Sequence, residues 1–65
     1  MEKLLTPKEL SLLLQVKQST VYKWAHYGYV PMVKLGSLIR FKESKIEEWL
    51  GKRQRKGRHS YALKN

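Results

Sequence analysis

The stretch that most constrains how this chain can fold is residues 16–25, Val-Lys-Gln-Ser-Thr-Val-Tyr-Lys-Trp-Ala. In a helix, Val21, Trp24 and Ala25 would share one face, because residues three and four positions apart lie above one another. The opposite face would carry hydroxyl, amide, imidazole and amino groups from Lys17, Gln18, Ser19, Tyr22, Lys23 and His26. Such groups suit base edges and phosphates in a DNA major groove, and a plain solvated helix face is the alternative. The neighbouring segments help to decide between these two interpretations.

A helix-start signal precedes this stretch. Thr6 can cap with its hydroxyl, Pro7 suits the first helical position, and Glu9 completes a capping box. The apolar positions that follow with a helical period are Leu10, Leu13 and Leu14. A turn at residues 15–17 would then join two short helices, which is the helix-turn-helix arrangement.

The second helix is expected to end near Tyr27. Gly28 can adopt the left-handed conformation of a helix C-cap, and Pro31 follows shortly afterwards. Residues 32–41 alternate between apolar and polar side chains around Gly36, which predicts a β-hairpin.

The loop length of this hairpin decides which side chains share a face. A two-residue loop would place Arg40 opposite Val33 on the apolar face. A three-residue loop instead aligns Val33 with Phe41 and leaves Lys34 and Arg40 together on the outer face, so we expect this register. Leu38 would then be exposed at the tip. There it could contact a DNA minor groove or a neighbouring protein, or be an incidental surface leucine.

Residues 42–50 predict a third helix that ends at Gly51. Its buried stripe would consist of Ile46, Trp49 and Leu50. We expect Trp24 and Trp49 to belong to the core. The predicted fold is mainly α with a small β-hairpin, in the order α-α-β-β-α, followed by a basic tail.

The charge of the chain is uneven. The net charge is +9 over 65 residues: residues 1–50 carry +3, and residues 51–65 carry six basic side chains and no acidic one. Such a balance suits a polyanion, above all nucleic acid, although ribosomal proteins and membrane-surface peptides are basic too. The absence of cysteine excludes a disulfide scaffold. With no apolar run long enough for a membrane and no secretion leader, we expect a cytoplasmic protein.

We divide the chain into a folded domain, residues 1–51, and a basic tail, residues 52–65, which we expect to be a fraying helical extension or a flexible, disordered segment. The tail has no hydrophobic period, and its like charges repel. Its candidate phosphate contacts are Lys52, Arg53, Arg55, Lys56 and Arg58. It could instead order on a protein partner through Tyr61 and Leu63, or serve only to solubilise the chain.

The predicted segments resemble the small winged helix-turn-helix proteins of the excisionase family, which are related to the DNA-binding domain of MerR-type regulators. The resemblance covers roughly residues 4–50 and is carried by residues 5–10, Val16, residues 19–24, Pro31, residues 34–36, Arg40, Phe41 and residues 46–50. It implies that the second helix enters the major groove and that the hairpin is a wing over the DNA backbone or minor groove.

By position, the resemblance implies that the major-groove candidates are Lys17, Gln18, Ser19, Thr20, Tyr22 and Lys23, and the wing candidates Lys34, Ser37 and Arg40. Thr20 could instead bond locally, and Tyr22 could pack against the wing. Two departures concern the turn: the family often has glycine where Gln15 stands and a serine cap where Lys17 stands. A left-handed Gln15 would cost roughly 1–2 kcal/mol, and a missing cap typically about 1 kcal/mol.

The function that this resemblance implies is that of an excisionase-like accessory factor. Such a factor binds repeated double-stranded DNA sites cooperatively, bends the DNA and steers a site-specific recombinase. A small MerR-like transcriptional regulator that meets RNA polymerase is the alternative, and a basic protein- or RNA-binding adapter is a second. Recognition of RNA by this helix is disfavoured, because the deep major groove of A-form RNA excludes a helix. We expect a monomer in solution, bacterial or phage-encoded and associated with the nucleoid.

An enzyme is not expected. His26 and His59 lie in different segments, and there is no thiol, phosphate-cradling glycine loop or pair of converging acids. The sequence has no cluster of residues that could ligate a metal, so no metal or cofactor is expected.

Overall fold

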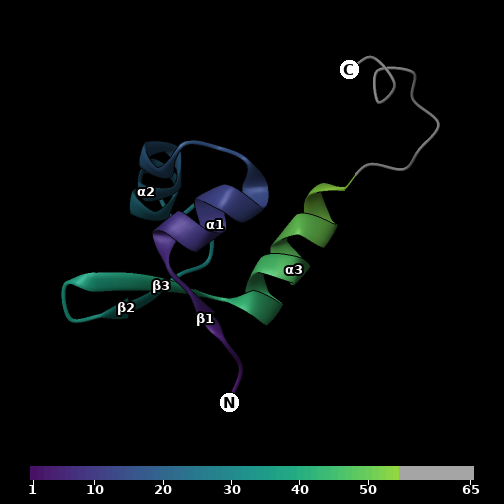
Figure 1. Cartoon of the computed structure of the whole chain (residues 1–65). Helices are drawn as coiled ribbons and strands as arrows, with labels where there is room; N and C mark the ends of the chain where they lie inside the picture. The colour runs from purple at the N-terminus through teal and green to yellow at the C-terminus, as the bar shows by residue number, and fades with distance from the viewer. Residues whose placement is uncertain (55–65) are drawn as a thin grey trace.

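The computed structural model describes residues 1–54, and these form three helices and three strands (Figure 1). In chain order the elements are β1 (Leu4–Leu5), α1 (Pro7–Leu14), α2 (Gln18–His26), β2 (Val33–Leu35), β3 (Leu38–Lys42) and α3 (Glu43–Arg53). This order confirms the predicted winged helix-turn-helix. The strand β1 was not predicted, because two residues are too few to show an alternating pattern. None of the described helices is long and apolar enough to cross a membrane.

The start of α1 is closed by the predicted capping box. The backbone N–H of Glu9 donates to Thr6 Oγ1 over 3.0 Å, and the backbone N–H of Thr6 donates to Glu9 Oε1 over 2.9 Å. The bond from the Thr6 backbone holds the pKa of the Glu9 carboxyl below its ordinary value of 4.5. Each side chain thus satisfies an amide that the helix cannot pair internally.

The buried face of α1 differs from the predicted stripe at one position. Leu10 is fully buried and Leu14 packs against the core, as expected, but Leu13 is 58% exposed. Ser11 is buried in its place, and its hydroxyl donates to the Lys8 carbonyl over 2.7 Å. The helix is therefore rotated so that its contact with α2 and β3 centres between Leu10 and Ser11.

The turn between α1 and α2 spans residues 15–17, as predicted. Gln15 has a φ of 58°, its N–H donates to the Leu12 carbonyl, and the N–H of Val16 donates to the Ser11 carbonyl over 3.0 Å. This pair of bonds is a Schellman motif, in which the left-handed residue is usually glycine. The expected strain of roughly 1–2 kcal/mol thus falls on Gln15.

The same motif ends α2, with a better suited residue. Gly28 has a φ of 75°, its N–H donates to the Ala25 carbonyl over 3.1 Å, and the Tyr29 N–H donates to the Trp24 carbonyl over 2.8 Å. The predicted end of the second helix is therefore confirmed. Tyr29 and Val30 then lead the chain back into the core, where Val30 is fully buried.

The predicted hairpin is present, but the predicted register is wrong. Val33 pairs with Arg40 and Leu35 with Leu38, so the loop has two residues, Gly36 and Ser37. Gly36 has a φ of 63°, as the first central residue of a type II′ turn requires, and this turn matches the natural twist of two paired strands. Turn chemistry therefore overrode the face pattern from which the register was inferred.

This register determines which residues face the core. Ile39 and Phe41 point inward from β3, where Phe41 is fully buried. Arg40 lies on the opposite face from them, because successive side chains of a strand alternate. On its other edge β3 pairs with β1, which places Leu5 beside Phe41 and makes the strand order β1-β3-β2.

The core lies between the helices and the inner face of the sheet. Its buried apolar members are Leu5, Leu10, Val21, Ala25, Val30, Phe41, Ile46 and Trp49. Trp24 is half-buried and packs against this cluster, whereas Leu50, expected to be buried, is 40% exposed.

α3 continues beyond its predicted end. Gly51 was expected to stop the helix, but among the described glycines only Gly28 and Gly36 have positive φ. Gly51 keeps a helical backbone, and α3 ends at Arg53. The guanidinium of Arg53 lies 4.7 Å from the ring centroids of both Tyr29 and Trp49, which holds the last turn against the domain.

Candidate nucleic-acid interface

The exposed face of α2 carries the predicted groove candidates. Lys17, Gln18, Ser19, Tyr22, Lys23 and His26 are all exposed, and Thr20 is half-buried. Val21 and Ala25 are buried on the opposite side, so the helix has the two faces that the sequence predicted. No acidic residue occurs within α2, which leaves the positive charge of Lys17 and Lys23 uncompensated on this helix.

The N-terminus of α2 is open. Lys17 occupies the N-cap position with an extended backbone, and no side chain caps the first turn. The Lys17 carbonyl accepts bonds from the amides of Thr20 and Val21, over 3.0 and 3.2 Å. The first amides of the helix, those of Gln18 and Ser19, precede these donors and point outward along the helix axis. Helix-start amides carry partial positive charge and suit a phosphate.

The hairpin separates its two basic candidates. Lys34 pairs with Ile39 and therefore lies on the side that faces α2, whereas Arg40 pairs with Val33 on the opposite side. The expected shared face of Lys34 and Arg40 is thus wrong. Arg40 is half-buried and its Nη1 donates to the Ile39 carbonyl over 2.7 Å. Ser37 and Leu38 are exposed at the tip, as predicted.

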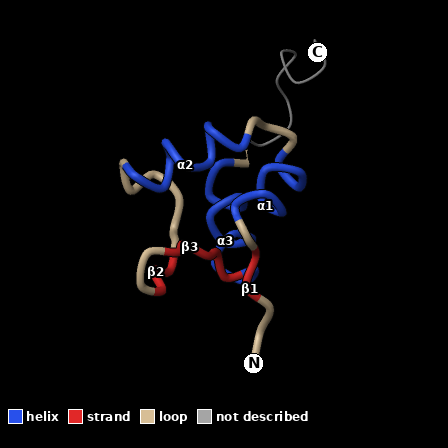
Figure 2. The backbone as a smooth tube through the Cα atoms, turned by 60° about the vertical axis from the view of Figure 1, so that its left-hand side comes forward, coloured by secondary structure: helices blue, strands red, loops and turns tan. Residues whose placement is uncertain are grey.

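A groove joins α2 to the hairpin. Its lining residues are Tyr22, Ala25, His26, Met32, Lys34 and Ile39, around a hollow of about 320 Å³. Two views of the backbone place α2 and the β2–β3 hairpin on the same side of the molecule (Figures 1 and 2). Candidates from two distant segments of the chain, Tyr22 and His26 on one wall and Lys34 on the other, therefore meet in one concave surface.

Two exposed residues of this surface were missed from the sequence. Met32 is 40% exposed and lines the groove, whereas the sequence predicts only that it begins the hairpin. Tyr27 is 72% exposed at the end of α2, and its ring centroid lies 5.6 Å from that of His26. Tyr27 stands at the expected end of the second helix and directly follows His26, so candidates chosen up to that end would have included it.

The first two basic residues assigned to the tail belong to the folded domain. Lys52 and Arg53 form the last turn of α3, which agrees with the helical extension among the two alternatives for this segment. Arg53 also donates from Nε to the Tyr29 hydroxyl over 3.1 Å and from Nη1 to the Trp49 carbonyl over 3.2 Å. The other tail candidates, Arg55, Lys56 and Arg58, lie outside the described residues, as do Tyr61 and Leu63.

Residues 1–54 contain no group of three or more histidine, cysteine or acidic side chains that could hold a metal ion. His26 lies beside Tyr22 and Lys34 in the groove, and no carboxylate lines this groove. Lys34 therefore gives the groove an uncompensated positive charge, and Tyr22 and His26 add hydrogen-bonding groups beside the apolar Ala25, Met32 and Ile39.

A tight pair of helices, an exposed polar face on the second helix and a hairpin beside it define a small winged helix-turn-helix protein. The sequence agrees, because residues 4–54 match the family model described as a helix-turn-helix domain. The chain therefore belongs to the helix-turn-helix domain family, which includes excisionase-like small DNA-binding proteins. Membership supports DNA binding in general, with double-stranded DNA as the partner. Searches of curated proteins and of solved structures found no match.

Proposed function

We propose that this protein is a sequence-specific, excisionase-like DNA-binding accessory factor that acts in the cytoplasm of a bacterium or on behalf of a phage. The observation that carries the proposal is the single groove in which Tyr22 and His26 of α2 face Lys34 of the hairpin. A helix in the major groove and a hairpin beside it would hold one stretch of DNA backbone between them. Such a groove serves a duplex better than it serves a small ligand, because its walls belong to two separate protruding elements.

Each part of the surface has its own task in this proposal. Gln18, Ser19 and Lys23 reach base edges from the exposed face of α2. The open amides at the start of α2, together with Lys17, bind a phosphate. Lys34 binds the backbone where it crosses from one groove to the next, and Arg40, on the other face of the hairpin, is directed to the flanking minor groove.

The small size of the reading surface supports the proposal of cooperative binding. One helix of nine residues contacts few base pairs, so a single domain gains limited specificity. Adjacent copies on repeated sites would supply the missing affinity, bend the DNA and present it to a site-specific recombinase. The same surface at a promoter would serve a small MerR-like regulator that meets RNA polymerase, and the binding pattern on DNA separates the two.

A titration tests the proposal directly. The protein is added to its own upstream genomic DNA and to a shuffled duplex of equal length, at near-physiological salt. A stepwise ladder of complexes on the genomic duplex alone supports cooperative binding to repeated sites. One complex at a promoter supports the regulator instead. Equal binding to both duplexes contradicts sequence-specific recognition and favours an adapter that binds nucleic acid by charge.

Two variants separate base reading from charge. Gln18→Ala is expected to reduce the preference for the genomic duplex by roughly 1–3 kcal/mol, since a bidentate base contact is lost. Lys34→Gln is the control. It is expected to weaken binding to both duplexes alike and to lower the slope of log K against log salt concentration by about 0.9, the value for one phosphate contact. An unchanged preference in Gln18→Ala would show that α2 is oriented differently on DNA.

A further inference from the structure

A second groove lies between α3 and the loop that follows α2. It is a hollow of about 480 Å³, and Tyr29, Pro31, Lys45, Trp49, Lys52 and Arg53 form most of its lining. Figure 1 shows α2 and the hairpin tip on one side of the molecule and α3 on the other. No groove or wing candidate of α2 or the hairpin lines this second groove, whereas Lys52 and Arg53, expected from the sequence to contact phosphate, do. With DNA held by α2 and the hairpin, this groove stays accessible.

The aromatic wall of this groove is held rigidly. The rings of Tyr29 and Trp49 meet edge to face with centroids 5.5 Å apart, and Trp49 Nε1 donates to the Tyr29 carbonyl over 2.8 Å. Arg53 lies over both rings and donates to the Tyr29 hydroxyl. Tyr29 nevertheless stays 45% exposed. A partner would thus meet a preformed aromatic surface, which lowers the entropy lost on binding.

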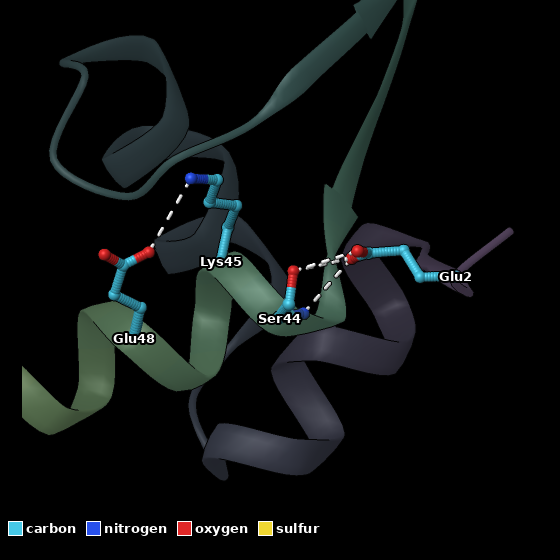
Figure 3. A network of polar contacts seen from close by, with 4 residues as sticks. All are labelled: Glu2, Ser44, Lys45 and Glu48. Carbon is cyan, nitrogen blue, oxygen red and sulfur yellow. Dashed lines mark hydrogen bonds and ion pairs between the residues drawn. The ribbon is translucent and has the colours of Figure 1, made fainter.

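The rim of the groove is cationic. Lys45, Lys52 and Arg53 lie along one side of α3, and Glu48 is the single carboxylate among the lining residues. Lys45 Nζ lies 3.7 Å from Glu48 Oε1, which offsets that carboxylate (Figure 3). Lys52 makes no ion pair within residues 1–54. Beyond Pro31 the surface continues into a smaller hollow of about 200 Å³ that Lys42 also lines.

We propose that this groove docks an acidic segment of a protein partner, whose aromatic or aliphatic side chain packs on Tyr29 and Pro31. Aromatic residues and arginine are the side chains that dominate protein–protein binding energies, and carboxylates complement the lysines of the rim. A DNA backbone suits the site less well, because a duplex is broad and convex whereas the groove is a hollow of about 480 Å³. The inference rests on the proposed function only in assigning DNA to the other side of the molecule.

The probe for this site is a fluorescent twelve-residue peptide of aspartate and glutamate around one central tryptophan, and binding is followed by anisotropy without DNA. Lys52→Glu is expected to weaken binding about tenfold, as the loss of a close charge contact and its reversal imply. Lys8→Glu on α1 is the matched control, since it changes the net charge equally but lies outside the groove. Its smaller loss measures the general attraction of a basic protein.

The anchor is tested in the same assay. A peptide with serine in place of its tryptophan is expected to bind the wild-type protein about tenfold more weakly than the tryptophan peptide does. Its affinity for Lys52→Glu is expected to be equally low. The inference is overturned if Lys8→Glu and Lys52→Glu lose the same affinity, since binding would then be unspecific attraction.

Two further outcomes name a different occupant and also overturn the inference. If Lys52→Glu weakens DNA binding as much as Lys23→Glu on α2, and DNA displaces the peptide, the groove is a phosphate surface. If the wild-type protein dimerises in sedimentation and Lys52→Glu abolishes the dimer, the groove belongs to a second copy. Because the peptide assay contains no DNA, a failure of the proposed DNA function leaves its result unaffected.

Discussion

α2 and α3 begin with the same kind of N-cap residue, but they differ in how the polar groups of the first turn are satisfied. Each follows a lysine with an extended backbone, Lys17 or Lys42, and neither lysine caps its helix. At α3 the carboxylate of Glu2 reaches the first turn and accepts bonds from the N–H of Ser44 over 3.2 Å and from its hydroxyl over 2.9 and 3.0 Å (Figure 3). At α2 no side chain does so. The helix that supports the fold has its first turn satisfied, and the helix assigned to DNA leaves it open.

The two helices also end differently. α2 stops in a Schellman motif around Gly28, which frees Tyr29 and the following loop to turn away. α3 runs through Gly51 in helical conformation until Arg53 packs on the aromatic rings of Tyr29 and Trp49. Of these two glycines, only Gly28, whose φ is positive, ends its helix.

The largest effect is expected from Trp49→Ala, which removes the anchor of α3. Trp49 is 8% exposed, donates to the Tyr29 carbonyl and lies beneath Arg53. Truncation of a buried tryptophan costs about 3–5 kcal/mol, against roughly 3–10 kcal/mol of total stability for a chain of this size. Urea unfolding followed by circular dichroism measures the loss, and Trp24→Ala on α2, where the ring is only half-buried, is expected to lose less.

Trp49→Phe keeps the prediction measurable if the alanine variant does not fold. The phenyl ring still fills most of the site but cannot donate to the Tyr29 carbonyl, so a loss of about 1 kcal/mol is expected. If Trp49→Ala proved no worse than Trp24→Ala, the two tryptophans would support the fold equally and α3 would not depend on this anchor.

The two helix-end glycines are expected to respond to alanine with opposite signs. At Gly28, with a φ of 75°, Gly28→Ala should destabilise the protein by about 1–2 kcal/mol. At Gly51 the backbone is helical and a Cβ would meet no atom within 4 Å, so Gly51→Ala should stabilise it by about 0.5–1 kcal/mol. Midpoints of urea unfolding measure both changes. Losses in both variants would mean that α3 also ends at its glycine.

Local signals in the sequence predicted most of the helical framework. The capping box of Thr6 and Glu9, the turn around Gln15 and the end of α2 at Gly28 each depend on residues within a few positions of one another. The exposed face of α2 followed from its helical period alone. The role of that face on DNA is still a prediction, because geometry places the side chains without showing what they bind.

Features that depend on distant segments were not predictable in the same way. Glu2 caps a helix turn 42 residues away, and Arg53 packs on a tyrosine 24 residues earlier in the chain. The predicted hairpin register is wrong for a different reason: the apolar pattern predicts that Val33 and Leu35 face the core, but both lie on the outer face of the hairpin. Gly36 and its turn type held the better signal.

The next effect is smaller and tests the open start of α2. Lys17→Ser introduces a hydroxyl at the N-cap, which should stabilise the protein by about 1 kcal/mol. The same change should weaken DNA binding, because the new cap occupies an amide assigned to a phosphate and a positive charge is lost. Lys42→Ser is the control on α3, where Glu2 already serves the first turn. We expect it to gain less stability and to bind DNA with nearly unchanged affinity; equal gains and equal DNA affinities in the two variants would contradict the contrast between the helix starts.

The smallest effect concerns the cap that closes α3, and it depends on pH. Hydrogen bonds from the Ser44 hydroxyl, and then from its backbone N–H, hold the pKa of the Glu2 carboxyl below its ordinary value of 4.5. Because the folded-state pKa is lowered, the stabilisation is complete above pH 4.5 and is lost as the pH falls through the folded-state value. Glu2→Gln should therefore unfold at a lower temperature than the wild type at pH 7, and the two melting temperatures should converge in acid.

Glu9, whose pKa is also lowered, keeps some acid dependence in both proteins, so convergence rather than a flat profile is the expected result. Glu47→Gln is the matched control, since Glu47 is exposed on α3 and its side chain makes no hydrogen bond or ion pair within residues 1–54. Its melting curve should follow the wild type at every pH. If Glu2→Gln instead ran parallel to the wild type down to pH 3, the carboxylate charge would contribute nothing, and α3 would begin as open as α2.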